Sequence, residues 1–336
     1  MQEIRIRVGL DAFGSDNAPI PEVEGAVLAL REDICDRIVL FGEEKVLEKE
    51  LGKYFYDSKR LLIQNCTERV TMSDSPSRII RKKSDSSMVR VIQACKEGEV
   101  DVALSAGNTG AMMSASLFLY GRLKNFLRPA IATLFPTVKG VELLLDVGAN
   151  AECSAETLVQ FAEIGSLYTH YFFGKESPQV GLINIGEESS KGNELYKRTN
   201  KLLQEHPDLN FSGNIEGKDL LEGDVDVIVS DGFTGNIMLK TVEGAATSMF
   251  KILKEQFNKD WISKLGALLS YPAFAFLKKK VDHREYGGAL LVGLNGLSVV
   301  AHGRSDAVAI KNAIKTSVQM VRSKFLEHAR EYYESK

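Results

Sequence analysis

The sequence lacks the features that mark secreted, membrane-spanning and metal-binding proteins. Its four cysteines are scattered without a CxxC spacing, and its five histidines form no HExxH or HxxxH pair. We therefore expect a reduced, cytoplasmic protein with no metal site. The N-terminal sequence MQEIRIRVGLDAFG has no apolar stretch followed by a small-residue cleavage site, and no run of about 18 apolar residues occurs. These absences predict neither secretion nor a membrane span.

An excess of positive charge is also absent, because the formal net charge is −3 over 336 residues. Polyanion binding usually needs a basic face, so we expect no nucleic-acid partner. The composition, 44% hydrophobic and 26% charged, is that of a globular protein. No linker rich in Pro, Gly and Ser divides the chain. We expect one domain over 1–336, built from two intertwined α/β subdomains.

Short apolar, β-branched runs alternate with longer segments of helical period. The runs are RIRVGL, DRIVLFG, LLIQN, DVALS, VELLLDV, QVGLINI, DVIVS and ALLVGL. Such alternation predicts parallel strands joined by crossover helices in an α/β sheet. The segment 157–173 is expected to be an amphipathic helix. Its apolar face comprises Leu158, Phe161, Ile164, Leu167 and Tyr171.

Two stretches of the chain repeat one pattern: DVALSAGNTGAMM from Asp101 and DVIVSDGFTGNIM from Asp226. In each, Asp-Val begins a short strand, a serine ends it, and Gly-x-Thr-Gly leads into a helix. A weaker echo joins LLDVGAN (144–150) with LINIGEE (182–188). Duplication and shared turn chemistry both account for the likeness. The identical positions are Asp101/Asp226, Val102/Val227, Ser105/Ser230, Gly107/Gly232, Thr109/Thr234, Gly110/Gly235 and Met113/Met238.

A strand-to-helix turn of this kind directs unpaired N–H groups and a helix dipole at one point, where anions bind. Thr109 and Thr234 could cap the helices or donate a hydroxyl to a ligand. Helix capping alone explains one such turn, but several at the carboxyl ends of strands favour a ligand site. The residues expected to contact substrate in these turns are Ser105, Gly107, Asn108, Thr109, Gly110, Asp146, Gly148, Asn150, Asn184, Gly186, Asp231, Gly232, Thr234 and Gly235.

The N-terminal segment GLDAFGSD has P-loop spacing up to its second glycine. Ser15-Asp16 stands where Lys-Ser/Thr is needed, which excludes nucleoside triphosphate hydrolysis, and no GxGxxG follows a strand. Asp11 and Asn17 lie just beyond the first strand and could contact a ligand. The alternative is that 16–19 forms a turn that caps the next helix.

Two side chains are suited to stabilising negative charge. Lys191, in INIGEESSKGNE, follows a strand end and could reach an anion or a developing oxyanion, although a solvated lysine is the alternative. Asn236 is expected at the first turn of the helix after DGFTG. No Ser-His-Asp or Cys-His set is visible, which favours a mechanism without a covalent enzyme nucleophile.

Two further segments suggest contacts with partners. RKKSDSSM (81–88) places three cations before a helix capped by Asp85 or Ser86, which could gather phosphate or an acidic carrier, or be a solvated turn. The segment 261–280 reads as an apolar hairpin broken at Pro272 and edged with lysines. It suits an anionic lipid surface, and a dimer or core contact is the alternative. Its expected membrane contacts are Trp261, Leu265, Leu268, Leu269, Phe274 and Phe276.

Taken in order, these motifs closely resemble the bacterial phosphate acyltransferases of phospholipid synthesis, the PlsX family. The resemblance runs almost end to end. Departures are Phe13 and Ser15 where methionine and glycine are usual, and Leu290 where proline is usual. The matching motifs are LDAFGSDNAP, SDSP, RKKSDSSM, SAGNTGAMM, LRPAIA, DVGANAEC, LINIGEESSKGNE, FSGNIEGKD, DGFTGNIMLK, EYGGALLVG and HGRSDAVAIKNAI.

The resemblance implies that inorganic phosphate attacks an acyl-carrier-protein thioester, giving acyl phosphate and the carrier thiol, with Lys191 and Asn236 as the catalytic pair and no cofactor. A thiol of pKa about 8.5 is a fair leaving group, which agrees with that reaction. The implied fold is that of isocitrate and isopropylmalate dehydrogenases, three α/β/α layers around a large mixed sheet. Across its pseudo-dyad the two repeated turns become walls of one cleft.

The resemblance also implies partners. It predicts a homodimer whose product feeds a membrane acyltransferase acting on glycerol 3-phosphate, which gives 261–280 a reason to touch the inner face of the cell membrane. Three alternatives stay open on the sequence. They are a phosphotransacetylase-like enzyme using acyl-coenzyme A, an NAD-dependent hydroxy-acid dehydrogenase and a non-catalytic membrane-surface scaffold.

Overall fold

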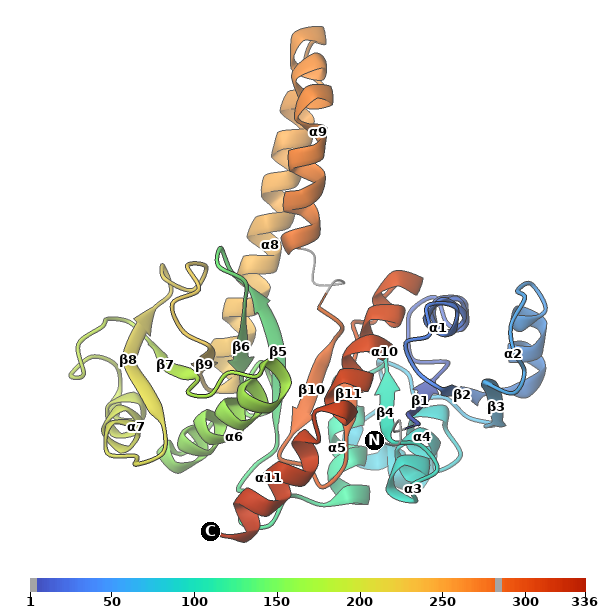
Figure 1. The fold of residues 1–336 in the computed structure, drawn as a ribbon, viewed down its shortest axis with the longest axis horizontal. Helices are drawn as coiled ribbons and strands as arrows, with labels where there is room; N and C mark the ends of the chain where they lie inside the picture. Colours follow the sequence, from blue (N-terminus) through green and yellow to red (C-terminus); the bar gives the residue numbers. More distant parts are fainter. Residues whose placement is uncertain (1–4, 282–285) are drawn as a thin grey trace.

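The computed structural model describes residues 5–281 and 286–336, and its centre is one sheet of 11 strands (Figure 1). Their order across the sheet is β3-β2-β1-β4-β11-β10-β5-β6-β9-β7-β8. All eight expected strands are present. The bounds are β1 (Arg7–Asp11), β2 (Arg37–Gly42), β3 (Leu61–Asn65), β4 (Val102–Ser105), β5 (Ala130–Pro136), β6 (Val141–Leu145), β7 (Gln179–Asn184), β8 (Asn210–Glu216), β9 (Val227–Val229), β10 (Ala289–Val292) and β11 (Ser298–Val300).

The strands form two parallel blocks, β3-β2-β1-β4-β11 and β6-β9-β7-β8, joined through antiparallel pairs that involve β10 and β5. The mixed sheet is therefore confirmed, whereas the parallel arrangement expected of the predicted strands is wrong for β10, which is antiparallel to both of its neighbours. Only residues 137–140 separate β5 from β6, and only 293–297 separate β10 from β11. Parallel neighbours need a crossover of about a dozen residues, so these short links force antiparallel pairing.

Both faces of the sheet are covered by helices, as three layers require. Every residue of β1 from Val8 to Asp11 is buried, and successive side chains of a strand point to opposite faces. A Cβ on Gly9 would lie 2.6 Å from the Val91 side chain of α4, so α4 covers one face closely. The helices are α1 (Ile20–Arg31), α2 (Glu44–Leu51), α3 (Ile79–Lys82), α4 (Ser87–Lys96), α5 (Thr109–Tyr120), α6 (Ala155–Phe173), α7 (Glu194–Gln204), α8 (Gly232–Phe257), α9 (Trp261–Val281), α10 (Ala307–Arg322) and α11 (Phe325–Glu334), with a 3₁₀ turn at Pro76–Arg78.

Local sequence signals explain several helix boundaries. The amphipathic helix expected over 157–173 is confirmed as α6, whose N-cap Ser154 accepts the Thr157 N–H. Helix α4 follows Ser86 as N-cap, one of the two caps expected there. Asp85, the other candidate, instead accepts hydrogen bonds from Thr67.

Helices α8 and α9 form a long antiparallel pair that projects from the body of the molecule (Figure 1). The expected break at Pro272 is wrong, because α9 continues through it and the chain reverses at 258–260 instead. A proline inside a helix removes one backbone hydrogen bond. Packing of α9 on α8, including Phe274 against Phe257 at 5.1 Å between ring centroids, offsets that loss.

The outer surface of this helical pair is strongly apolar. Trp261, Leu268 and Leu269 expose 74%, 71% and 75% of their surface, and Leu265 and Phe276 are exposed as well. The side chains of residues 278, 279 and 281 lie outside the described residues. Among the helices that are described, none combines the length and hydropathy needed to cross a bilayer.

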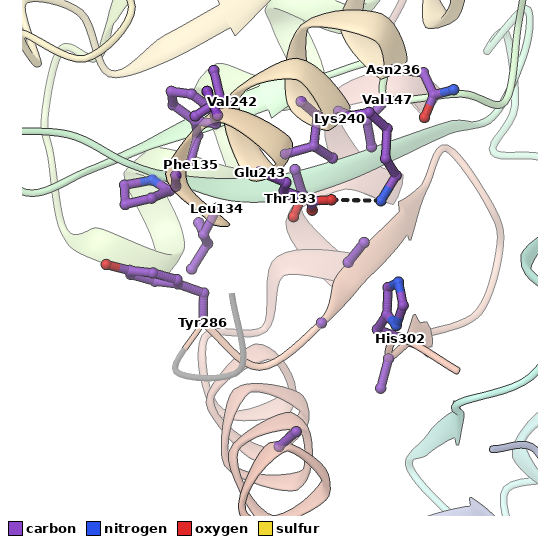
Figure 2. A pocket seen from close by; sticks show the side chains of 18 of the residues that line it. Thr133, Leu134, Phe135, Val147, Asn236, Lys240, Val242, Glu243, Tyr286 and His302 are labelled. Atoms are coloured by element: carbon purple, nitrogen blue, oxygen red, sulfur yellow. Dashed lines mark hydrogen bonds and ion pairs between the residues drawn. The ribbon is translucent and has the colours of Figure 1, made fainter. Parts of the chain in front are cut away.

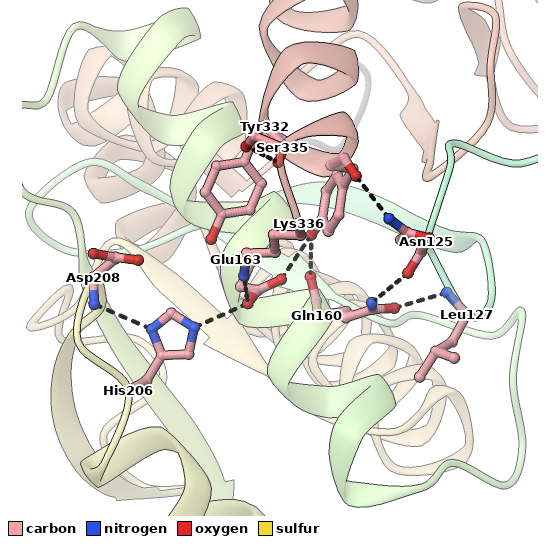
Figure 3. Close-up of polar contacts among 10 residues, drawn as sticks. Asn125, Leu127, Gln160, Glu163, His206, Asp208, Tyr332, Ser335 and Lys336 are labelled. Carbon is pink, nitrogen blue, oxygen red and sulfur yellow. Dashed lines mark hydrogen bonds and ion pairs between the residues drawn. The ribbon is translucent and has the colours of Figure 1, made fainter.

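The C-terminal helix is fixed to α6 by a carboxylate (Figure 3). Glu163 accepts the Tyr333 hydroxyl at 3.1 Å and is paired with Lys336. His206 Nδ1 accepts the Asp208 N–H, so its Nε2 carries the proton that reaches Glu163 at 2.9 Å. These bonds join α6, the segment after α7 and the C-terminus, which are distant from one another in sequence.

Candidate active site

The loops that follow β1, β4 and β11 pack on one another and form one wall of a cleft. The Asp16 N–H donates to the Gly303 carbonyl, and the Ala301 N–H donates to the Ser105 carbonyl, each at 2.8 Å. A Cβ on Gly14 would lie 2.8 Å from the Gly107 nitrogen. Glycine at position 14 therefore permits the close approach of two backbone segments.

Asp11 and Ser105 support this wall from beneath. The Ser105 hydroxyl donates to the Asp11 carboxylate at 2.6 Å and accepts the Gly107 N–H at 3.0 Å. Burial raises the pKa of Asp11. Both side chains are shut away from solvent, so their geometry favours a positioning role over the expected direct contact with substrate. Asn17, by contrast, is exposed.

The two repeated turns start their helices at different positions. In the first, Asn108 is the N-cap, accepts the Ala111 N–H, and α5 begins at Thr109. In the second, Asp231 is the N-cap and α8 begins at Gly232, two positions earlier in the alignment of the copies. Asn236 thus lies one turn inside α8 rather than in its first turn. The backbone N–H groups that lack a helical partner belong to the residues before Asn236, so the backbone of Asn236 is not free to bind an anion. Its side-chain amide is the group that can contact a ligand.

The second wall is organised by Asp146, which has no exposed surface. Its Oδ1 accepts the N–H groups of Ile131, Gly148 and Ala149 at 3.0 to 3.2 Å. Its Oδ2 accepts the backbone and side-chain N–H groups of Asn150 at 2.7 and 2.9 Å. With both oxygens engaged, Asp146 and Asn150 shape the loop 146–150 that was expected to bind substrate.

Glycines seat the start of α8 on this loop. A Cβ on Gly235 would lie 2.0 Å from the Asp146 carbonyl oxygen, and one on Gly232 would lie 2.7 Å from the Asn150 carbonyl oxygen. Any larger residue would push the helix away. A Cβ on Gly148 would touch Asn236 at 3.7 Å, so the loop and the amide are neighbours.

Threonines at matching positions of the two turns have different tasks. The Thr234 hydroxyl and N–H both bond to Asp231, which also accepts the Tyr196 hydroxyl at 2.7 Å. Burial, followed by the hydrogen bond to Asp231, raises the pKa of Tyr196. Asp231 and Thr234 are thereby committed to the cap, whereas Thr109 lines the cavity described below. Asn108 is committed too, since its Nδ2 donates to the Met72 carbonyl.

Lys191 lies in the loop after β7. Its carbonyl accepts the Asn184 side chain at 3.2 Å, and a Cβ on Gly186 would meet its Cγ at 2.9 Å. The ammonium is exposed and forms no ion pair or hydrogen bond with the described residues. Lys191 does not line the cavity that holds Asn236, so this structure does not bring the expected catalytic pair together in one cavity.

A cavity of about 490 Å³ lies between the two parallel blocks (Figure 2). Thr109 and Asn236 both line it, which confirms that the repeated turns border one cleft. Sequence reasoning did not assign five of its polar residues, although the motifs DGFTGNIMLK and HGRSDAVAI contain three of them. The polar lining residues are Thr109, Thr133, Asn236, Lys240, Glu243, His302 and Ser305.

The remaining lining is largely apolar and comes from β5, α8, α9, β10, β11 and α10, with Val147, Leu221, Tyr286, Gly288 and Ala301 from loops. Over 5–281 and 286–336, no group of three or more His, Cys, Asp or Glu side chains is arranged to hold a metal ion. The described chemistry of the cleft is thus that of amides, hydroxyls, one Lys–Glu pair and a histidine beside a long apolar wall.

Comparison with known proteins identifies the family. The family model described as "Fatty acid synthesis protein" matches residues 6–328. A phosphate acyltransferase from Fusobacterium nucleatum is 47% identical over 330 residues, 98% of this chain and 99% of the relative. The chain belongs to the phosphate acyltransferase family. Relatives of the same name from Clostridioides difficile and Geobacter sulfurreducens are 43% and 46% identical, covering 97% and 94% of this chain and 96% and 91% of theirs.

Solved structures agree with the fold. A phosphotransacetylase from Streptococcus pyogenes has a TM-score of 0.63 at 15% identity, and the match covers 95% of this chain and 94% of that one. A protein described as a 4-hydroxythreonine-4-phosphate dehydrogenase from Salmonella typhimurium has a TM-score of 0.55 at 13% identity, covering 95% and 100%. The expected α/β fold is confirmed. Membership of the family assigns to the chain the transfer of an acyl group to phosphate and a part in lipid synthesis.

Proposed function

We propose that the acyl donor is a fatty acyl thioester of acyl-carrier protein and that the acceptor is inorganic phosphate. The observation that carries this proposal is the shape of the cleft, which joins a polar end holding Asn236 and Thr109 to a long apolar wall. A polar end suits the reacting thioester and phosphate, and an apolar wall suits a fatty chain.

The reaction needs little proton transfer by the protein. A phosphate oxygen forms a bond to the thioester carbonyl carbon, the carbon–sulfur bond then breaks, and the thiolate leaves and takes a proton from solvent. Negative charge develops on the carbonyl oxygen in between. The Asn236 amide and the Lys191 ammonium are the proposed groups that stabilise this charge and hold the phosphate. Because Lys191 does not line the cavity that holds Asn236, its proposed role requires the loop after β7 to move toward the cleft.

A basic edge near the start of α5 suits an anionic acyl donor, and the family resemblance makes an acidic carrier protein the proposed one. Arg81 and Lys82 are exposed, whereas Lys83 is held by Asp74 at 2.6 Å. A Cβ on Gly110 would lie 3.2 Å from Pro76, so this edge adjoins the polar end of the cleft. It could receive an acidic carrier. The alternative donor, acyl-coenzyme A of a phosphotransacetylase-like enzyme, is separated by comparing acyl phosphate formation with each donor.

The projecting pair α8–α9 is proposed to contact the inner face of the cell membrane, as a peripheral attachment of a cytoplasmic homodimer. Its exposed apolar side chains support such a contact. The acyl phosphate would then be released near the membrane acyltransferase that uses it to acylate glycerol 3-phosphate.

The decisive assay incubates the protein with palmitoyl-carrier protein and labelled phosphate and measures acyl phosphate. Asn236→Ala and Lys191→Ala are each expected to lower kcat by about 10²- to 10³-fold, as loss of an oxyanion donor does. Asn258→Ala, at the far end of α8, and Lys197→Ala, on exposed α7, are the matched controls and should retain full kcat. Near-full activity of folded Asn236→Ala would refute its assigned role.

Membrane attachment is tested with liposomes containing anionic lipid. Leu268→Glu together with Leu269→Glu is expected to abolish sedimentation with the vesicles. The control is Phe55→Glu, because Phe55 is 92% exposed at a site outside the helical pair. If the double variant still binds liposomes, these leucines are not the membrane contact. If only its sedimentation coefficient changes, they belong to another surface, such as the contact between two copies of the chain.

A further inference from the structure

We propose that the acyl chain lies along one face of α8, in the apolar part of the cavity, and that this cavity sets the chain length that is transferred. The inference rests on the proposed function, since it places the fatty chain of that donor. Beyond that function, the inference assigns to the cavity a binding site for a hydrocarbon chain of limited length.

The lining residues of α8 recur at the spacing of one helix face, which carries Asn236, Leu239, Glu243, Ala246, Phe250 and Leu253. At 1.5 Å per residue this face is about 25 Å long. A lipid acyl chain spans about half of the 30 Å hydrocarbon core of a bilayer, or about 15 Å. The face is therefore long enough for a complete chain that starts beside Asn236.

The opposite side of the cavity is apolar as well. Strand β5 contributes Leu134 and Phe135, β10 contributes Ala289, and α10 contributes Ala309. Figure 2 shows Leu134, Phe135 and Tyr286 gathered away from Asn236 and His302, with the Lys240–Glu243 pair and Thr133 between the two groups. A chain that starts beside Asn236 passes this pair and then meets hydrocarbon on both sides.

The two charged lining residues do not oppose this placement. Lys240 Nζ lies 2.7 Å from Glu243 Oε2, so each neutralises the other. Paired charges cost less to bring near hydrocarbon than an isolated charge would. The cavity of about 490 Å³ also falls within the usual range of 300 to 1,000 Å³ for small-ligand sites.

Substitutions at two depths test the site. Ala246→Phe adds bulk midway along the face, and Leu253→Trp adds bulk at its far end. We measure kcat/KM with carrier proteins loaded from hexanoyl to stearoyl. Ala246→Phe should lower kcat/KM for palmitoyl by about tenfold or more and leave hexanoyl unchanged, because each buried methylene contributes about fourfold. Leu253→Trp lies about 25 Å from Asn236 along the face, beyond the end of a chain of about 15 Å, and should leave the profile unchanged.

Ser248→Phe is the matched control, because Ser248 is exposed on the same helix and does not line the cavity. It should leave the chain-length profile unchanged. A profile equally insensitive to Ala246→Phe would overturn the proposal. So would a change of oligomeric state in Ala246→Phe with no change in the profile, since the face would then be a contact between two copies of this chain.

A second measurement does not depend on catalysis. A fatty acid carrying a photoactivatable diazirine at its far end is crosslinked to the intact protein, and the labelled peptides are mapped. Labels on 246–253 support the site, and labels confined to other segments refute it. If no donor yields acyl phosphate, the proposed function fails while this labelling still decides the chain site.

Discussion

Replacing Asp146 by asparagine should destabilise the protein and disturb the cleft, although the two side chains have nearly the same shape. The Asp146 carboxylate is fully buried and accepts five hydrogen bonds, three on Oδ1 and two on Oδ2. An asparagine keeps one acceptor oxygen. Its NH₂ group must face N–H donors that have no other partner within reach.

The least costly arrangement turns the NH₂ toward Asn150, where it opposes the backbone N–H and side-chain amide of that residue. The Asn150 amide cannot simply flip, because its Nδ2 also donates to the Pro129 carbonyl at 2.8 Å. One or two buried donors are therefore left unsatisfied, each costing about 1 to 3 kcal/mol. The total loss in the free energy of unfolding is expected to be about 2 to 5 kcal/mol.

Urea unfolding followed by circular dichroism measures this loss, which should lower the midpoint by about 1 M. Asp224→Asn is the control, since Asp224 forms only an exposed ion pair with Lys139 and should change stability by less than about 1 kcal/mol. The kcat of Asp146→Asn should also fall, because Gly148 in the same loop adjoins Asn236. If Asp146→Asn unfolds at the wild-type midpoint with unchanged kcat, the loop does not depend on these hydrogen bonds.

Two further substitutions test packing and pH dependence. Gly235→Ala should lower the free energy of unfolding by about 1 to 3 kcal/mol and also lower kcat, because the added Cβ would lie 2.0 Å from the Asp146 carbonyl oxygen. Thermal melts measure the loss of stability. The control is Gly244→Ala, whose Cβ meets nothing within 4 Å and which should be neutral or stabilising. Burial raises the pKa of Glu22 from 4.5 to about 7, so the folded state binds the extra proton and stability falls as pH rises through that window. Glu22→Gln should remove this fall and raise the free energy of unfolding by up to about 3 kcal/mol at pH 8, whereas Glu24→Gln on the same helix should change neither. If the stability of Glu22→Gln and of the wild type falls in parallel with pH, Glu22 is not the group responsible.

Strands with continuous apolar, β-branched sequences could be predicted, and those without them could not. AIATLFP of β5 ends in proline, NFSGNIE of β8 is largely polar with an internal glycine, and SVV of β11 has only three residues. Their places in the sheet depend on partners distant in sequence. The antiparallel middle of the sheet follows from short links whose meaning is clear only when both neighbouring strands are known.

The candidate site was predictable as a set of turns but not as a set of roles. Asp146, Asp231 and Thr109 all stand at strand-to-helix turns, yet only Thr109 lines the cavity. Whether a polar side chain faces the backbone or the cleft depends on local hydrogen-bond geometry that a motif does not specify. The apolar wall was not predicted, because its residues come from β5, α8, β10 and α10 and share no local pattern.

Helix α8 has a mechanical consequence, because one uninterrupted element of 26 residues carries both Asn236 near its inner end and exposed Met249 and Ile252 near its outer end. It contains no proline and is about 39 Å long. A stiff helix of this kind tilts about the point where it is packed most closely, which here is the contact of Gly235 with the Asp146 loop. A force that displaces the outer end of α8 must therefore either bend the helix or rotate the Asn236 amide relative to Gly148.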